Sequence, residues 1–167
     1  MRGMKLLSCW KNGKESMINK AQEEYIKKLI YCDSQEKIMK NLNSIAETEM
    51  LYVYAYNYNW DNGFEIPRII LNNVCCDLST ALMMFYSVEG EIYLEDKNQP
   101  KENGLTEWFM FLEWLYNKIM EGSYDRGNIH FKPPLNKVQL YKLNKMLTTE
   151  EKIFTEEFGE DNLNVVL

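Results

Sequence analysis

The sequence predicts an all-α fold: a single domain of about seven or eight short helices, arranged as an irregular array of helix pairs. Three observations predict it. Apolar residues recur at helical spacing, capping signals precede several of these stretches, and polar segments with glycine or proline separate them. The chain has 167 residues, a usual length for one domain, so we expect residues 1–167 to share one core.

Two helices are expected within residues 14–46. In the first, over residues 16–31, Met17, Ala21 and Tyr25 lie four residues apart and form one apolar stripe. The segment DSQE (33–36) follows. It predicts Asp33 as the N-cap of the second helix and Glu36 as its capping-box partner.

A third helix is predicted from Glu49 to about Asn57, with Thr48 as its cap. Its sequence LYVYAYNYNW places tyrosines at alternate positions, which would also suit a strand. We favour a helix because helical segments flank this stretch closely. A turn is expected next, since the pair Asn62-Gly63 tolerates positive φ.

Pro67 suits the first turn of a short fourth helix that ends near residue 73. Asp77 is the predicted N-cap of a central helix over residues 78–94, with apolar side chains on both faces. Gly90 either interrupts or ends this helix.

The last part of the chain alternates helices with polar connections. We predict an insertion-tolerant loop over 95–104, an aromatic helix over 106–120 and an irregular, extended stretch over 123–134. A helix capped by Asn136 then runs to about residue 147. The capping box TTEE (148–151) begins a final helix that reaches Gly159.

Charge and composition narrow the possible partners. The net charge is −6, and a phosphate-binding surface needs lysine and arginine, so we expect no nucleic-acid partner. The longest uncharged runs reach only about half of a membrane-spanning length, and the N-terminal apolar stretch is too short for a signal peptide. We therefore expect a cytoplasmic protein that does not bind membranes.

The chain has 4 cysteines. They form neither a Cys-x-x-Cys pair nor a cluster with the single histidine, so we expect no metal and no cofactor. Buried reduced thiols are the expected state, and they agree with a cytoplasmic location.

Candidate catalytic groups have structural explanations. Asp77 is explained as an N-cap, Asp61 as the acceptor within its own turn, and Glu65 as an acid at the positive end of the Pro67 helix. His130 lies in NIHFK without a neighbouring nucleophile motif. We therefore predict no catalysis, with a hydrolase that uses Asp61, Glu65 and His130 as the alternative.

Two features could bind a partner protein. Trp60 beside the turn could anchor an interface, although packing between two helices is the favoured interpretation. Four carboxylates also cluster after the central helix, with Tyr93 among them as a possible aromatic anchor: Glu89, Glu91, Glu95 and Asp96. A solvated face is the simpler explanation of this cluster, and contact with a basic partner is the functional one.

The segments NWDNGFEIPRIILNN and CDLSTALMMFY resemble a bacterial family classified as a domain of unknown function. Its members show an Asn-Trp-Asp-x-Gly turn, then Glu-Ile-Pro, then Cys-Asp-Leu-x-Thr-Ala. The resemblance extends over about residues 50–145, including NIHFKPPLNKVQLYKL. Ser79 departs from this pattern, in which a small residue such as glycine is expected, and the change is conservative at a helix start. The matching positions include Trp60, Asp61, Gly63, Glu65, Pro67 and Asp77.

The resemblance implies a small α-helical intracellular protein for which no catalytic residues can be named. Similar proteins look like neighbours of polymorphic toxins, including contact-dependent inhibition systems, in which they would act as immunity proteins. We therefore expect an immunity protein that contacts a basic toxin domain through the acidic cluster. A helical adaptor would differ from it only in its partner.

Overall fold

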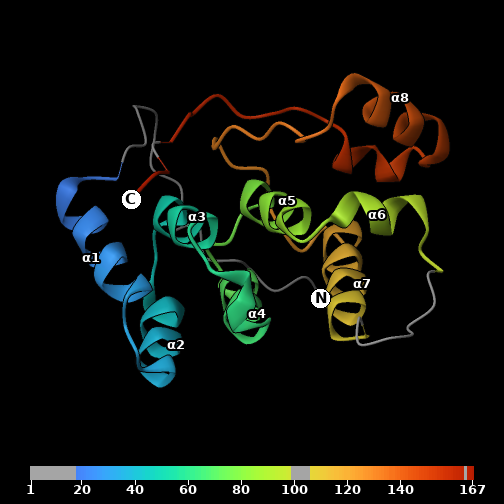
Figure 1. Cartoon of the computed structure of the whole chain (residues 1–167). Coiled ribbons are helices and arrows are strands. Elements are labelled where there is room, and N and C mark those ends of the chain that lie inside the picture. Colours follow the sequence, from blue (N-terminus) through green and yellow to red (C-terminus); the bar gives the residue numbers. More distant parts are fainter. Residues whose placement is uncertain (1–17, 99–105, 164) are drawn as a thin grey trace, which may run out of the picture.

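The computed structural model describes residues 18–98, 106–163 and 165–167, and within these ranges it confirms the all-α fold. It contains eight α-helices and two short 3-10 helices, and the described residues form no β-strand (Figure 1). The α-helices are α1 (Lys20–Ile30), α2 (Gln35–Ser44), α3 (Thr48–Tyr56), α4 (Glu65–Asn72), α5 (Leu78–Ser87), α6 (Gly90–Glu95), α7 (Thr106–Met120) and α8 (Lys137–Met146). The 3-10 helices are η1 (Trp60–Asn62) and η2 (Glu150–Phe154).

Helices α3 and α5 lie at the centre of the molecule. α3 packs against α5 and α1, α5 also packs against α7, and α2 packs against α4 (Figure 1). The central position of α5 follows from its composition. The helix carries apolar side chains on both faces, and eight of its ten residues are buried. One buried cluster runs through these helices, with Phe85, Phe111 and Phe154 among its largest fully buried side chains.

Short polar side chains begin several helices, as their sequences indicate. Asn19 caps α1 in a capping box with Gln22, and Asn136 caps α8 in the same way with Gln139. Asp77 caps α5. These caps satisfy backbone N–H groups that have no partner within the helix.

Two predicted caps are wrong. Ser34, not Asp33, caps α2, because Ser34 has the extended backbone and accepts the N–H of Lys37 at 3.4 Å. Thr48 is the first residue of α3, and its hydroxyl donates to the carbonyl of Cys75 at 2.9 Å. In each case the residue lies one position away from the predicted place in the helix.

The central helix is shorter than predicted. α5 ends at Ser87, and α6 begins at Gly90 after Glu89 has adopted a left-handed conformation with φ 60°. Trp108 donates its indole N–H to the carbonyl of Val88 at 2.8 Å, which satisfies a backbone group at this break. Gly90 therefore lies at an interruption of the helix.

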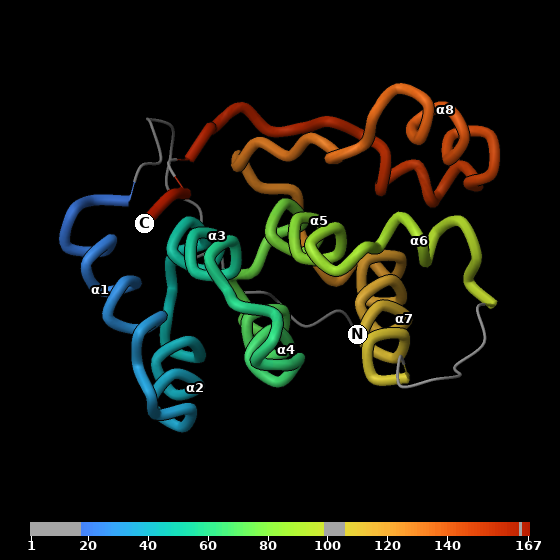
Figure 2. The backbone as a smooth tube through the Cα atoms, in the orientation of Figure 1, coloured from blue at the N-terminus to red at the C-terminus, as the bar shows by residue number. Residues whose placement is uncertain are grey.

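The predicted final helix to Gly159 is also wrong. Only η2 forms, and the chain then runs extended beside residues 128–131 and back across the molecule (Figure 2). Phe158 and Phe131 exchange backbone hydrogen bonds of 2.8 and 3.1 Å, and their rings lie 5.7 Å apart. Pairing with a segment remote in sequence thus replaces local helical bonds.

The expectation that the cysteines are reduced thiols is wrong at Cys75. Cys75 is disulfide-bonded, whereas Cys32 and Cys76 carry free thiols.

In the described part of the chain, no helix combines the length and the apolar character needed to cross a bilayer. Residues 1–17, which include the start of the predicted first helix, and most of the predicted 95–104 loop lie outside the described residues.

Candidate functional site

The corner between α3 and α4 is held by its own backbone and by two side chains, Asn59 and Tyr58, whose hydroxyl donates to the carbonyl of Gly63 at 2.8 Å. Asn59 precedes η1, and its side-chain oxygen accepts the N–H of Asp61 at 3.1 Å. Gly63 ends the turn at φ 82°, a conformation that glycine adopts without strain. The expectation that Asp61 accepts within its own turn is wrong, because Asn59, two residues earlier, provides that acceptor.

Trp60 packs into an aromatic group that joins this corner to α7. Its ring centroid lies 5.4 Å from Tyr58, 6.2 Å from Phe64 and 5.9 Å from Phe111, which is fully buried on α7. Pro67, in the first turn of α4, is buried as well. Trp60 thus connects two helical segments that are about fifty residues apart in sequence.

The corner carboxylates do not converge. Asp61 is exposed, and Glu65 accepts a hydrogen bond from the side chain of Gln35 on α2 at 2.6 Å. A cavity beside the corner is lined by Asn59 and Asn62, but neither Asp61 nor Glu65 lines it. The described residues contain no group of three or more potential metal ligands.

His130 belongs to another part of the molecule. Its Nε2 lies 3.0 Å from Glu157 of the C-terminal segment, and Lys132 contacts the same carboxylate at 3.4 Å. The hydrogen bond from His130 and the charge of Lys132 hold the pKa of Glu157 below its usual value. His130 is therefore engaged with Glu157, while Glu65 is engaged with α2.

Asp77 is one of two buried acids among the described residues, with a relative exposure of 6%. Its Oδ1 accepts both the N–H and the hydroxyl of Thr80, at 2.8 and 2.7 Å. Its Oδ2 is buried without a hydrogen-bond partner among the described residues and faces Gly127, where an added Cβ would lie 2.6 Å away. Burial raises the pKa of Asp77 to about 6.

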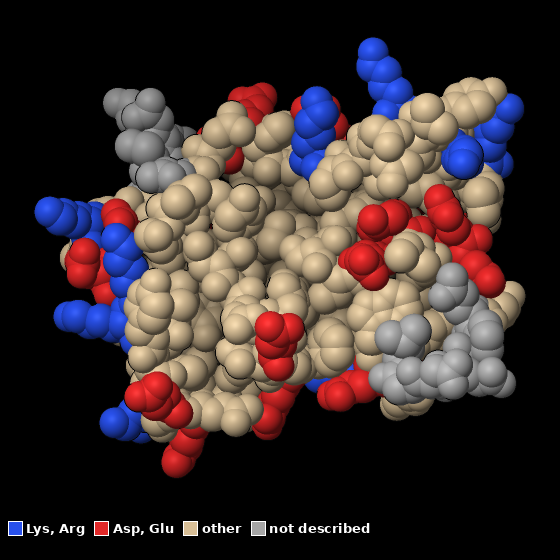
Figure 3. All heavy atoms as spheres, in the orientation of Figure 1, with Lys and Arg blue, Asp and Glu red and all other residues tan. Residues whose placement is uncertain are grey.

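Four acidic residues lie within α6 or directly beside its ends. Glu89 precedes the helix, Glu91 and Glu95 lie within it, and Asp96 follows it. Glu89, Glu95 and Asp96 are exposed and Glu91 is half-buried. In the parts of the chain that the structure describes, Glu89, Glu91 and Glu95 form no ion pair with a basic side chain. Acidic side chains gather over this region in Figure 3. We call these four residues the α6 acidic cluster.

Tyr93 does not belong to that surface. Its relative exposure is 4%, and its ring packs against Phe85, Phe109 and Tyr116 at centroid distances of 5.4 to 6.4 Å. The expectation that Tyr93 stands beside the carboxylates as an aromatic anchor is not met. The residue turns inward because α6 is a separate helix that lays its apolar side on α7.

Sequence reasoning missed a second role of Glu151. Besides bonding the N–H of Thr148 at 2.9 Å in the predicted capping box, its carboxylate accepts the hydroxyl of Tyr116 at 2.5 Å and pairs with Lys97. Burial would raise the pKa of Glu151, but the bonds from Lys97 and Tyr116 outweigh it and lower the pKa to about 2. Only the capping box was visible in the sequence, because the other partners are remote.

These features define an all-α protein built around an aromatic corner, with an acidic cluster on its surface. Residues 46–120, from just before α3 to the end of α7, match the family model described as "Domain of unknown function (DUF4274)". This match supports the expected resemblance to a domain-of-unknown-function family. No curated protein and no solved structure matches the chain.

Proposed function

We propose that this chain is an immunity protein that binds and neutralises a cognate toxin. The toxin would be a basic nuclease domain of a contact-dependent inhibition system or of another polymorphic toxin system. The α6 acidic cluster carries the proposal, because its carboxylates are largely exposed and three of them lack a basic partner within the described residues. Neither nucleic acid nor membrane is proposed as a partner.

The mechanism is electrostatic recognition followed by occlusion. The nuclease surface that binds phosphate is basic, so an acidic surface attracts it and accelerates encounter. The net charge of −6 adds to that attraction. Once bound, the α6 acidic cluster occupies the place of substrate phosphates and prevents access to the nuclease active site.

The proposal includes a cytoplasmic location, in which the free thiols of Cys32 and Cys76 are stable. The disulfide at Cys75 counts against that location, because disulfides are rare in a reducing cytosol. No enzymatic function is proposed, since Glu65 and His130 are paired with different parts of the fold.

A protection experiment tests the proposal. The toxin gene adjacent to the gene for this chain is expressed with and without it, and growth is measured. We expect the chain to restore growth and to co-purify with the toxin at low salt, with less complex at high salt. Clean expression of both proteins without rescue would reject the immunity function.

Matched charge variants test the surface. One variant carries Glu89→Gln, Glu91→Gln and Glu95→Gln. Its control carries Glu24→Gln, Glu36→Gln and Glu160→Gln, at three exposed carboxylates outside the α6 acidic cluster. Both change the net charge equally. We expect only the first to lose rescue, whereas equal rescue by both would place the interface elsewhere.

A further inference from the structure

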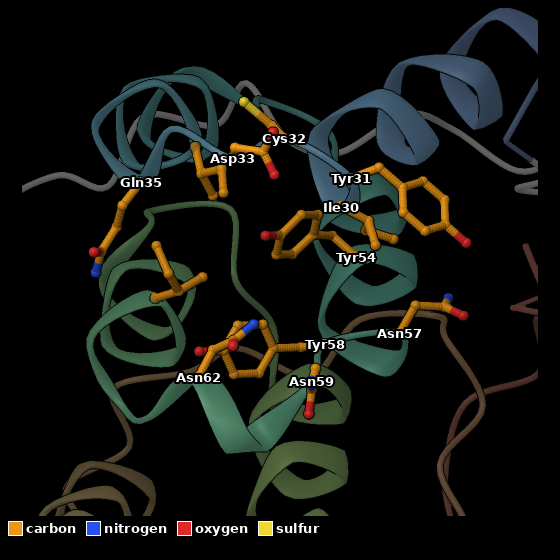
Figure 4. A pocket seen from close by; sticks show the side chains of 12 residues that line it. Ile30, Tyr31, Cys32, Asp33, Gln35, Tyr54, Asn57, Tyr58, Asn59 and Asn62 are labelled. Atoms are coloured by element: carbon orange, nitrogen blue, oxygen red, sulfur yellow. The ribbon is translucent and has the colours of Figure 1, made fainter.

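A cavity of about 560 Å³ opens beside the aromatic corner. It lies between the α1–α2 connection, the end of α3, the η1 turn and the start of α4 (Figure 4). Cavities of this size accommodate small organic ligands. The site is separate from the α6 acidic cluster, so the inference goes beyond the proposed function and does not depend on it.

Two polar groups face the cavity from different segments, Asp33 from the α1–α2 connection and Tyr54 from α3. Figure 4 shows the Asp33 carboxylate and the Tyr54 hydroxyl directed towards the same space. Asp33 is exposed and has no hydrogen-bond or ionic partner in the described structure, because Ser34 rather than Asp33 caps α2. Tyr54 has a relative exposure of only 3%, and its hydroxyl has no bond to another described residue.

The charged side chain among the described residues that line the cavity is acidic. None of the described residues that line it is lysine, arginine or histidine. Asp33 supplies a carboxylate, and Glu65 lies close by through its hydrogen bond to the lining residue Gln35. An anion would meet repulsion here, whereas a cation would be attracted.

The remaining wall suits an apolar or aromatic body. Ile30, Ile38 and Ile66 line the cavity, and the rings of Tyr54 and Tyr58 border it. Tyrosine faces attract organic cations, and isoleucine side chains bury alkyl groups. The cavity therefore offers apolar contacts along its wall and one charged group, the Asp33 carboxylate.

We propose that this cavity binds a small amphipathic organic cation, an alkyl- or arylammonium. Its ammonium group donates to Asp33 and to the Tyr54 oxygen, and its hydrocarbon part packs against the three isoleucines. The side-chain amides of Asn59 and Asn62 border the site and supply further hydrogen-bonding groups.

The tyrosines are in the protonation state that this role needs. Burial raises the pKa of Tyr54 to about 12, with Tyr58 and Cys32 nearby adding to the shift. Burial and the charge of Glu65 raise the pKa of Tyr58 to about 12. Both phenols are therefore neutral near pH 7, and the Tyr54 oxygen can accept a hydrogen bond from an ammonium group.

Three probes of equal length test the recognition of charge. The full chain is titrated by calorimetry with n-hexylammonium, hexanol and hexanoate. We expect n-hexylammonium to bind at least about tenfold more tightly than either other probe, equivalent to about 1.4 kcal/mol. Equal binding of hexanol, preferred binding of hexanoate, or no measurable binding of n-hexylammonium would overturn the proposal.

Conservative variants locate the site. Asp33→Asn removes the charge and Tyr54→Phe removes the hydroxyl while keeping the ring. The control Asp61→Asn alters an exposed carboxylate that does not line the cavity. We expect n-hexylammonium binding to weaken by about tenfold in Asp33→Asn, less in Tyr54→Phe and not in Asp61→Asn. Circular dichroism verifies that each variant is folded.

Amide chemical shifts give a second measurement of position. Added n-hexylammonium should shift the resonances of Tyr54 and Asn62 in the unmodified chain, and at the same subsaturating probe concentration these shifts should be smaller in Asp33→Asn. Unchanged affinity of Asp33→Asn, or shifts confined to the α6 acidic cluster, would show that the cation binds elsewhere and would reject this cavity.

Discussion

Asp77 combines a favourable and an unfavourable interaction in one side chain. One oxygen caps α5 and bonds Thr80 twice, while the other is buried without a partner against Gly127. Capping stabilises a helix by about 1 kcal/mol, but an ionised carboxylate in an apolar surrounding is costly. The raised pKa of about 6 shows that the cost of burial outweighs the effect of the bonds on ionisation.

The stability of the protein should therefore depend on the protonation of Asp77. Its pKa is about 6 in the folded chain, against 3.8 for an unperturbed aspartate side chain. The stabilisation is fully present below pH 3.8 and is lost as the pH rises through about 6. The full difference corresponds to about 3 kcal/mol, of which about 2 kcal/mol falls between pH 4.5 and 7.5.

Asp77→Asn keeps the oxygen that accepts the Thr80 N–H and removes the ionisation. We expect the free energy of unfolding of the wild type to fall by about 2 kcal/mol relative to the variant between pH 4.5 and 7.5. Urea titrations at several pH values measure this difference. Asp61→Asn, at an exposed position, is the control and should follow the wild type. Parallel curves for Asp77→Asn and wild type would contradict the assignment.

At the scale of elements, the break between α5 and α6 determines which of the surrounding side chains are exposed and which are buried. Glu89 turns the chain with a left-handed backbone, and Gly90 allows the new helix to lie directly over Phe85. A Cβ at position 90 would approach the Phe85 ring to 2.2 Å and the Phe85 carbonyl oxygen to 2.6 Å. The break carries the α6 carboxylates to the surface while Tyr93 turns inward.

Gly90→Ala should therefore destabilise the protein. The added methyl group must displace a buried ring and a backbone carbonyl, and such overpacking costs about 1–3 kcal/mol. Thermal and urea unfolding measure the change. Ser87→Ala, at an exposed residue of α5, is the control and should have a small effect. An unchanged stability of Gly90→Ala would mean that α6 does not pack on Phe85 as described.

Local signals predicted most of these elements. Helices α3, α7 and α8 lie within one residue of the bounds that the sequence predicts, although Thr48 lies inside α3 and does not cap it. The predicted helix bounds are wrong where a segment remote in sequence forms backbone hydrogen bonds that replace the local helical ones. The last helix stops at Phe154 because Phe158 pairs with Phe131, and no pattern within residues 151–159 reveals that partner.

At the scale of the whole molecule, the C-terminal segment joins parts of the fold that are far apart in sequence. Tyr86 of α5 donates its hydroxyl to the carbonyl of Phe154 at 2.7 Å. The segment then returns to α3, where the Asn57 side chain donates to the carbonyl of Val165 at 2.6 Å. The Thr155 hydroxyl also donates to the side chain of Asn144 on α8 at 2.9 Å. The segment therefore contacts the central helices as well as α8, and we expect it to unfold together with them.

Phe154→Ala tests this coupling. Phe154 is fully buried, and its ring lies 5.0 Å from that of Phe85 and 5.3 Å from that of Tyr116. Removing such a ring costs about 3–5 kcal/mol. We expect one cooperative unfolding transition at lower denaturant concentration by both circular dichroism and tryptophan fluorescence. Val166→Ala, at an exposed residue, should leave it unchanged, and two separate transitions in Phe154→Ala would show independent unfolding.

The sequence by itself determined the helical class, most helix starts and the apolar residues available for a core, because caps and helical spacing act over only a few neighbouring residues. The tertiary structure decided which carboxylates remain apart, that Tyr93 is buried and that Asp33 and Tyr54 face one cavity. These outcomes depend on packing between segments remote in the chain, and periodicity and capping carry no information about that packing.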